Sequence, residues 1–307
     1  MLLIGLELGT LTKLNCQYSF REDKLLDLKK LKQIVKSVST TLKTKNIVPI
    51  QNLTDKEDIL KDKVALITGG NGGIGFAIAQ KFIKSGCAVI IGGTNKQKLI
   101  QCCEELKKMG GNAKWIIIDF TKTSVLYNEI EKAAKFYNHI DILVNAAGIH
   151  STKSFTNFYN ITEDEYDNIL NINLRGTYFV SQAMAKYMID NKVKGHILNI
   201  SSSTGGEPAW SPYRLSKLGI EGFTKGLAQM LTKHGITVNG IAPGSTATSL
   251  LGYQKGDSIA TFDNEVGRYI LPSEVAEYAK ILVSNLGDMV VGETIYISGG
   301  RGKYDIR

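Results

Sequence analysis

The chain has 307 residues, of which 43% are hydrophobic and 21% are charged, close to the average of soluble globular proteins. Its formal charge of +8 suits anionic ligands such as phosphates, but no basic run carries interleaved aromatic residues, so we expect no nucleic-acid partner. The cysteines form no CxxC pair and the histidines are scattered, which argues against a disulfide framework and predicts no metal site.

Residues 1–59 differ from the rest of the chain because they are rich in Lys, Leu, Thr and Ser and poor in glycine. Within them Leu28, Leu31, Val35 and Val38 recur at helical spacing among lysines, which predicts one basic amphipathic helix followed by a linker. Three fates stay open for this extension: docking on its own domain or a subunit, binding an acidic partner or membrane surface, or disorder. We favour docking on protein.

The apolar start MLLIGLEL lacks the basic region and the cleavage site of a signal peptide, and no run is long enough to span a membrane. We therefore expect a cytoplasmic protein without a membrane span.

Residues 60–307 alternate short apolar runs with helical stretches, and most of the runs end in glycine or a small polar residue. Near-continuous apolar strands that alternate with helices predict a parallel sheet covered on both faces. The expected fold is an α/β, three-layer, doubly wound parallel sheet of the Rossmann type. In chain order the expected strands are KVALITGG, CAVIIGG, AKWIIIDF, IDILVNAAG, GHILNISS, GITVNGIAPG and GETIYISGG.

The stretch TGGNGGIG, residues 68–75, ends the first expected strand and begins the first expected helix. Its glycines let the backbone turn tightly and approach a phosphate, and the start of the helix offers N–H groups and the positive end of its dipole. The string fits GxGxxG and GxxxGxG alike, and the strand–loop–helix context is the one that this motif requires. We expect a bound dinucleotide to contact Gly69, Asn71, Gly73, Ile74 and Gly75.

The second expected strand ends in Gly92-Gly93-Thr94-Asn95-Lys96, without the acidic residue that holds a ribose 2′-hydroxyl in many dinucleotide folds. An acid there would repel a 2′-phosphate. Asn71, Thr94, Asn95 and Lys96 could donate hydrogen bonds to that phosphate. The strand end therefore favours NADP(H), and NAD(H) stays open.

The stretch SPYRLSK, residues 211–217, places a phenol and an ammonium group four residues apart after a helix-start signal. Ser211 suits an N-cap and Pro212 the first helical position, so Tyr213 and Lys217 should share one face of a helix. Taken alone, the pair also fits an amphipathic helix with a solvated lysine.

Residues 60–302 resemble the short-chain dehydrogenase/reductase family, in its shorter single-domain branch. The glycine loop, the fourth-strand stretch Asn145-Ala146-Ala147-Gly148 and the Tyr213/Lys217 pair occur in the order of the family's motifs. The resemblance implies further cofactor contacts at Asp119, Phe120, Asn145, Ala146, Gly148, Tyr213, Lys217, Pro243, Gly244, Thr246 and Thr248, and catalytic roles for Asn173, Ser202, Tyr213 and Lys217.

Several of these positions have simpler explanations. Asp119 could cap the next helix, Asn173 could cap backbone groups only, and Asn145 and Gly148 could serve the geometry of the strand end. The interval from Ser202 to Tyr213 is short for the family, so Ser203 stays a rival for the catalytic serine.

Tyr213 has a chemical task in this resemblance, because hydride transfer to a carbonyl must be accompanied by a proton. An ammonium group about 4 Å away is worth roughly 4 kcal/mol at an effective dielectric constant near 20. We therefore expect Lys217 to lower the pKa of Tyr213 by about 3. The resemblance gives Lys217 a second role, holding the nicotinamide ribose, and lets Asn173 position a water linked to the lysine.

The resulting hypothesis is an NADPH-dependent carbonyl reductase of the 3-oxoacyl type. A sugar or polyol dehydrogenase and a non-catalytic dinucleotide-binding scaffold are the alternatives. The substrate would be a small carbonyl or alcohol, including a carrier-bound acyl group. Members of the family are often oligomers, so the resemblance also implies a homo-oligomer, either a tetramer or a dimer. We expect the substrate pocket to be bordered by His150, by residues 207–210 and by residues 250–268, with Trp210 either a substrate platform or simple packing.

Overall fold

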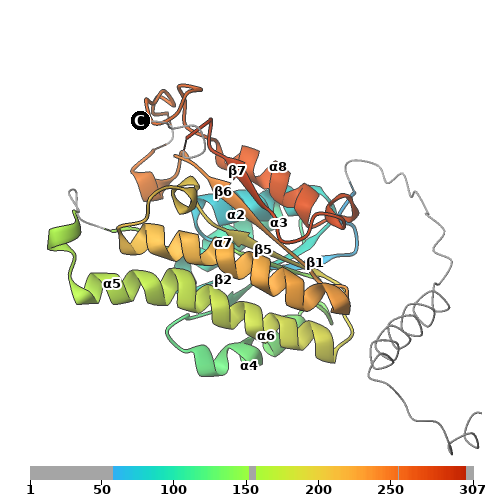
Figure 1. Cartoon of the computed structure of the whole chain (residues 1–307). Coiled ribbons are helices and arrows are strands. Elements are labelled where there is room, and N and C mark those ends of the chain that lie inside the picture. Colours follow the sequence, from blue (N-terminus) through green and yellow to red (C-terminus); the bar gives the residue numbers. More distant parts are fainter. Residues whose placement is uncertain (1–57, 152–156, 255, 302–307) are drawn as a thin grey trace, which may run out of the picture. The chain divides into compact units, whose positions relative to one another are not determined.

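The computed structural model of the chain describes residues 58–151, 157–254 and 256–301. The predicted helix around Leu28–Val38 and the linker that follows lie outside these residues. Within them, seven strands form one sheet in the order β3-β2-β1-β4-β5-β6-β7, and all neighbouring strands are parallel (Figure 1). The strands are β1 (Val64–Thr68), β2 (Ala88–Gly93), β3 (Ala113–Ile117), β4 (Ile142–Asn145), β5 (His196–Ile200), β6 (Thr237–Pro243) and β7 (Thr294–Ile297).

Helices cover both faces of this sheet, so the predicted three-layer α/β fold is confirmed (Figure 1). α2 (Gly73–Lys84), α3 (Lys96–Lys108) and α8 (Pro272–Leu282) pack on one face. α4 (Leu126–Ala134), α6 (Thr177–Asp190) and α7 (Pro212–Leu231) pack on the other, and α5 (Glu163–Leu170) lies against α7. Among the described helices, none is both long and apolar enough to cross a membrane.

The first strand shows why the sequence builds this sandwich. Successive side chains of a strand point to opposite faces, and here all five residues of β1 are buried. Ala65 and Ile67 join the core beneath α2, α3 and α8, whereas Val64 and Leu66 join the core beneath α4, α6 and α7. A strand that is apolar on both faces is stable only between two helical layers, which is the pattern of a parallel sheet.

The strand order reverses direction next to β1, which has β2 on one side and β4 on the other. Thr68, the last residue of β1, is in register with Gly92 near the end of β2 and with Asn145 at the end of β4. The loops that follow these three strands therefore leave the sheet at one edge, side by side. In open α/β sheets, ligands bind at such a switch point outside the carboxyl ends of the strands.

We predict that a chain shortened to begin at Ile59 folds and binds cofactor. Leu60 is fully buried and its N–H donates to the carbonyl of Ser85 at 2.9 Å, and Ile59 packs against the same core. The sheet is complete from β1 onward, so its closure does not need residues 1–58. Urea unfolding and cofactor titration by fluorescence measure the two properties.

The matched control is Leu60→Ala in the shortened chain, which should lower the free energy of unfolding by about 2–5 kcal/mol because it deletes a buried side chain. Failure of the shortened chain to fold, or complete loss of cofactor binding, would show that the extension is part of the catalytic domain and that the boundary at residue 60 is wrong.

Candidate active site

A cleft of about 330 Å³ lies at the switch point, between the loops that follow β1, β2, β3 and β4. It brings together residues that are far apart in the sequence and that the motifs predicted to contact a dinucleotide. Seven of the predicted contacts line it: Gly69, Asn71, Thr94, Asp119, Phe120, Ala146 and Gly148.

The glycine loop enters the cleft in a conformation that needs glycine. Gly69 has a φ of 66°, and a Cβ atom there would stand 2.6 Å from the Cα atom of Ala147, in the segment after β4. α2 begins directly after this loop, with Gly72 as an N-cap that provides no side-chain hydrogen bond, and its first turn holds no acidic residue. The first N–H groups of α2 and the positive end of its dipole are thus available to an anionic group.

The segment that follows β2 carries no acidic residue, and Asn71 from the glycine loop lies beside it. The side chain of Asn71 lies over Gly93: a Cβ atom added to Gly93 would stand 3.0 Å from Asn71 Oδ1. Asn95 caps α3, since its side-chain oxygen accepts from the N–H of Lys98 at 3.0 Å, and it does not line the cleft. Asn71 and Thr94 are the predicted donors that line the cleft at this point.

Asp119 also lines the cleft, and its carboxylate shapes a local turn. Its carboxylate accepts from the hydroxyl of Thr121 at 2.7 Å and from the N–H of Thr121 at 3.0 Å, and these bonds lower its pKa. The alternative that it caps the next helix is wrong, because α4 begins at Leu126 with Val125 as its N-cap.

Asn145 points away from the cleft. Its amide nitrogen donates to Ser181 Oγ and to Asn199 Oδ1, both at 2.8 Å, inside the layer between the sheet and helices α6 and α7. Asn145 therefore serves the geometry of the strand end, whereas Ala146 and Gly148, which follow it, line the cleft.

A second cavity, of about 180 Å³, adjoins the first. The two share the first turn of α2, because Gly72 lines the cleft and Ile74 lines the cavity, and they also share the segment in which Ile149 and His150 follow one another. The predicted residues in the second cavity are Ile74, Ser202, Tyr213, Pro243, Gly244, Thr246 and Thr248.

The start of α7 is as predicted and places Tyr213 in this cavity. Ser211 caps the helix by accepting from the N–H of Arg214 at 3.3 Å, and Pro212 is the first helical residue. The side chain of Tyr213 is hydrogen-bonded to that of Ser202, and the ring of His150 lies 4.6 Å from its ring, centroid to centroid. The bond to Tyr213 favours Ser202 over Ser203 as the serine of the site.

Lys217 lies one turn further along α7 and is buried. Its Nζ donates to the carbonyl oxygen of Ile200, at the end of β5, at 2.9 Å and stands 5.6 Å from the centroid of the Tyr213 ring. A Cβ atom added to Gly148 would stand 3.6 Å from the same Nζ, so the ammonium group lies next to Gly148, which lines the cofactor cleft.

Asn173 belongs to a π-helical segment, η4 (Asn171–Gly176), that joins α5 to α6. Its side chain is fully buried and bonds both backbone groups of Ile149: Oδ1 accepts from the N–H at 2.8 Å and Nδ2 donates to the carbonyl at 3.0 Å. Nδ2 also approaches Ser216 Oγ at 3.2 Å. Asn173 thus fixes the segment after β4, next to Lys217.

The electrostatics correct one expectation. Burial raises the pKa of Tyr213, although its hydrogen bond with Ser202 lowers it, and burial lowers the pKa of Lys217 to about 8. The predicted lowering of the phenol's pKa is therefore wrong, because burial removes both groups from water and so disfavours their charged forms. At neutral pH the phenol is protonated, which suits a proton donor.

Arg301 also lines the second cavity, and no motif in the sequence indicated it. The residue follows Gly299-Gly300 after β7, and only its place at the end of a parallel strand could have indicated it. Of the expected border, His150, Leu250 and Leu251 line the cavity, whereas residues 207–210 do not.

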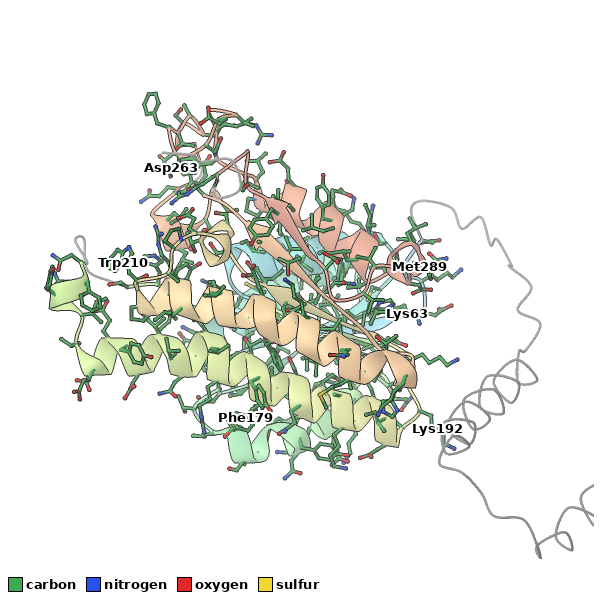
Figure 2. The ribbon with its side chains drawn as sticks, in the orientation of Figure 1. Lys63, Phe179, Lys192, Trp210, Asp263 and Met289 are labelled. Carbon is green, nitrogen blue, oxygen red and sulfur yellow. The ribbon has the colours of Figure 1, made fainter. Side chains whose placement is uncertain are left out.

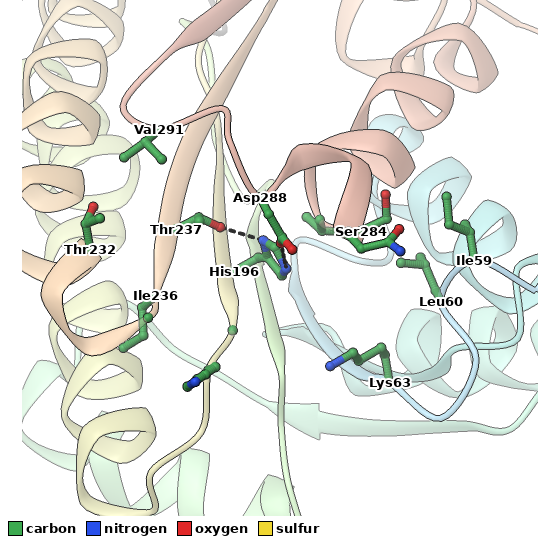
Figure 3. A pocket seen from close by; sticks show the side chains of 15 residues that line it. Ile59, Leu60, Lys63, His196, Thr232, Ile236, Thr237, Ser284, Asp288 and Val291 are labelled. Carbon is green, nitrogen blue, oxygen red and sulfur yellow. Dashed lines mark hydrogen bonds and ion pairs between the residues drawn. The ribbon is translucent and has the colours of Figure 1, made fainter. Parts of the chain in front are cut away.

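A third cavity, of about 510 Å³, lies at the opposite edge of the sheet and contains none of the predicted site residues (Figure 3). It surrounds His196, whose ring nitrogens face Thr237 and Asp288, at the amino ends of β5 and β6. Because ligands of open α/β sheets bind at carboxyl ends, we assign the chemistry to the two smaller cavities. In the described part of the chain, no cluster of three or more His, Cys, Asp or Glu could hold a metal ion.

Comparison with known proteins gives the family. The short chain dehydrogenase profile matches residues 63–257. The 3alpha-hydroxysteroid dehydrogenase of Mediterraneibacter gnavus is 34% identical over 250 residues, which cover 78% of this chain and 97% of the relative. The 3-oxoacyl-[acyl-carrier-protein] reductase FabG of Thermotoga maritima is 34% identical over 245 residues, 78% of this chain and 98% of the relative.

Solved structures agree. A single-residue variant of the actinorhodin polyketide ketoreductase, with NADPH, has a TM-score of 0.71 and 29% identity, over 79% of this chain and 98% of that one. A 3-oxoacyl-[acyl-carrier protein] reductase with bound NAD from Brucella melitensis has a TM-score of 0.70 and 29% identity, over 82% and 97%. The family model matches more than half of the chain, and the relatives match it over almost their whole length. The chain therefore belongs to the short-chain dehydrogenase/reductase family.

Proposed function

We propose that this chain is an NADPH-dependent carbonyl reductase that acts on a 3-oxoacyl-type substrate. As a family member it is an oxidoreductase that uses a nicotinamide cofactor. The observation that carries the proposal is that Tyr213 and Ser202 line one cavity, which adjoins a cleft lined by the glycine loop. This arrangement puts a proton donor beside the place that a cofactor would occupy.

A bound nicotinamide supplies the hydride, and the protein's residues supply the proton and the orientation. Tyr213, protonated at neutral pH, donates a proton to the carbonyl oxygen in the direction of reduction. Ser202 shares a hydrogen bond with Tyr213, so its hydroxyl can hold the same oxygen and stabilise its developing charge. Lys217 keeps a positive charge near the phenolate that proton donation leaves behind.

The substrate class is supported by the relatives' names. 3-Oxoacyl-[acyl-carrier-protein] reductases of Thermotoga maritima and Aquifex aeolicus are both 34% identical to this chain. A screen of 3-oxoacyl thioesters, small ketones, sugars and polyols, with NADPH and NADH followed at 340 nm, tests the proposal. Reduction of 3-oxoacyl thioesters is expected to be fastest, and oxidation of a sugar or polyol as the main activity would favour the alternative.

We also propose that the chain forms a homo-oligomer. α6 and α7 border an apolar groove of about 660 Å³ that is lined by Tyr178, Phe223 and Met230, and each of these helices presents large apolar side chains to solvent. Exposed apolar surface of this kind is typical of protein–protein interfaces.

Tyr213→Phe should lower kcat by about 10²- to 10⁴-fold and leave the Kd of the cofactor nearly unchanged, because it removes the proton donor and keeps the ring. Lys217→Met should lower kcat and also raise the Kd of the cofactor, since the ammonium group lies next to both the Tyr213 ring and Gly148 of the cofactor cleft. Steady-state kinetics measure the change in kcat, and fluorescence titration measures the change in the Kd of the cofactor.

The paired serines provide the control. Ser202→Ala should cost about 10²- to 10³-fold in kcat, and Ser203→Ala should cost less, because the bond to Tyr213 involves Ser202. Near-normal turnover by Tyr213→Phe would rule out this mechanism and support a non-catalytic scaffold.

NADPH should bind more tightly than NADH, because no acid stands at the end of β2 and Asn71 and Thr94 line the cleft there. Gly93→Asp should reverse this preference: a repulsion of roughly 1.4 kcal/mol is enough to weaken NADPH binding tenfold. Fluorescence titration with both cofactors measures the change.

Gly93→Ala is the matched control, since its Cβ atom meets Asn71 Oδ1 at the same 3.0 Å without adding charge. An equal effect of both substitutions on the two cofactors would indicate a steric cause, and tighter binding of NADH by the unmodified chain would contradict the proposed preference.

A further inference from the structure

Arg301 stands in the wall of the catalytic cavity, together with Tyr213 and Ser202. Among the described residues that line this cavity, it alone carries a permanent charge; the other lining side chains are apolar, hydroxylic or, at His150, imidazole. Figure 2 shows Asp263 and Trp210 on the side of the described domain that faces away from Lys63 and Lys192, and Asp263 accepts a hydrogen bond from Ser245, which lines the same cavity as Arg301.

Two bonds hold the guanidinium group in place. Its Nε donates to Glu207 Oε1 at 3.1 Å, and one Nη donates to Ser245 Oγ at 3.3 Å. An arginine has five N–H groups, so these two bonds leave donors for a ligand. The guanidinium group is held in place before any substrate binds, so less side-chain entropy is lost when a ligand binds to it.

The carboxylate beside Arg301 does not cancel its charge. Glu207 also forms an ion pair with Arg214 at 3.0 Å, so one negative charge is shared between two guanidinium groups. Asp263 lies farther out and accepts from Ser245, and it does not line the cavity. The trio of Glu207, Arg214 and Arg301 therefore carries one net positive charge at the rim of the catalytic cavity.

We propose that Arg301 binds an anionic oxygen group of the substrate, and that the enzyme thereby selects anionic carbonyl compounds over neutral ones. This inference rests on the proposed carbonyl reduction. A guanidinium group is suited to carboxylates and phosphates, which it binds through paired N–H donors. The anion is either the carboxylate of a small keto acid or a phosphate of a carrier-linked 3-oxoacyl thioester.

Two substrate pairs separate these sources. Acetoacetate and ethyl acetoacetate differ in a carboxylate, and acetoacetyl-coenzyme A and acetoacetyl-N-acetylcysteamine differ in phosphates. The full-length chain should show a higher kcat/KM for the anionic member of one pair. Arg301→Gln should lower kcat/KM for that member by about ten- to a hundredfold, mainly through KM, and leave its neutral counterpart nearly unchanged. Arg301→Lys should restore part of the loss.

Arg214→Gln is a second test of the charge, because it removes the other guanidinium partner of Glu207 from a residue that does not line the cavity. Glu207 is then left to Arg301 alone, so kcat/KM for the anionic member should fall by less than in Arg301→Gln, and kcat/KM for the neutral member should stay nearly unchanged. Equal losses for charged and neutral substrates in Arg301→Gln would overturn the inference, as would a loss confined to the Kd of NADPH. If the unmodified enzyme reduces none of the four compounds, carbonyl reduction itself is wrong and the inference falls with it.

Discussion

The burial of the Lys217 ammonium group is the constraint on which the rest of the site depends. A charge removed from water is tolerated only when it is hydrogen-bonded, and the carbonyl of Ile200 meets that need at 2.9 Å. The bond ties the second turn of α7 to the end of β5, and Ser201 Oγ adds a bond to the carbonyl of Lys217 itself at 3.1 Å. Tyr213 lies one turn earlier on α7. These bonds therefore hold its ring next to the Lys217 ammonium group and in the cavity that Ser202 also lines.

The parallel sheet makes this arrangement possible. All seven strands end at one edge, so the glycine loop after β1, the segment after β4 and the serines after β5 meet there although they are far apart in the sequence. The π-helical segment before α6 adds the last connection, because it directs the buried side chain of Asn173 onto the backbone of Ile149. Cofactor cleft and catalytic cavity are consequently two parts of one surface, separated only by the first turn of α2 and the residues after Gly148.

Patterns that involve neighbours in the sequence could be predicted, and those that depend on tertiary surroundings could not. The strands, the uncapped start of α2 and the Ser-Pro start of α7 follow from local composition, and the structure confirms them. The direction of the pKa change at Tyr213 was wrong because desolvation depends on which elements cover the side chain. Asn95 is expected as a donor from its place after β2, and Asn145 as a contact from the resemblance; the side chain of Asn95 caps α3, and the bond of Asn145 to Ser181 of α6 depends on tertiary surroundings that the sequence did not indicate. Arg301 escaped notice because its partner, Glu207, is 94 residues away.

The role of the buried Lys217 ammonium group can be measured through the pH dependence of reduction at saturating cofactor. Burial lowers the pKa of Lys217 to about 8 and raises that of Tyr213, so the ammonium is lost as the pH rises through 8 while the phenol stays protonated. Loss of that charge leaves the developing phenolate uncompensated. The account predicts that kcat for reduction falls between pH 7 and pH 9 with a midpoint near pH 8, and that Lys217→Met lacks this step. A kcat that is constant or rises over that range would contradict it.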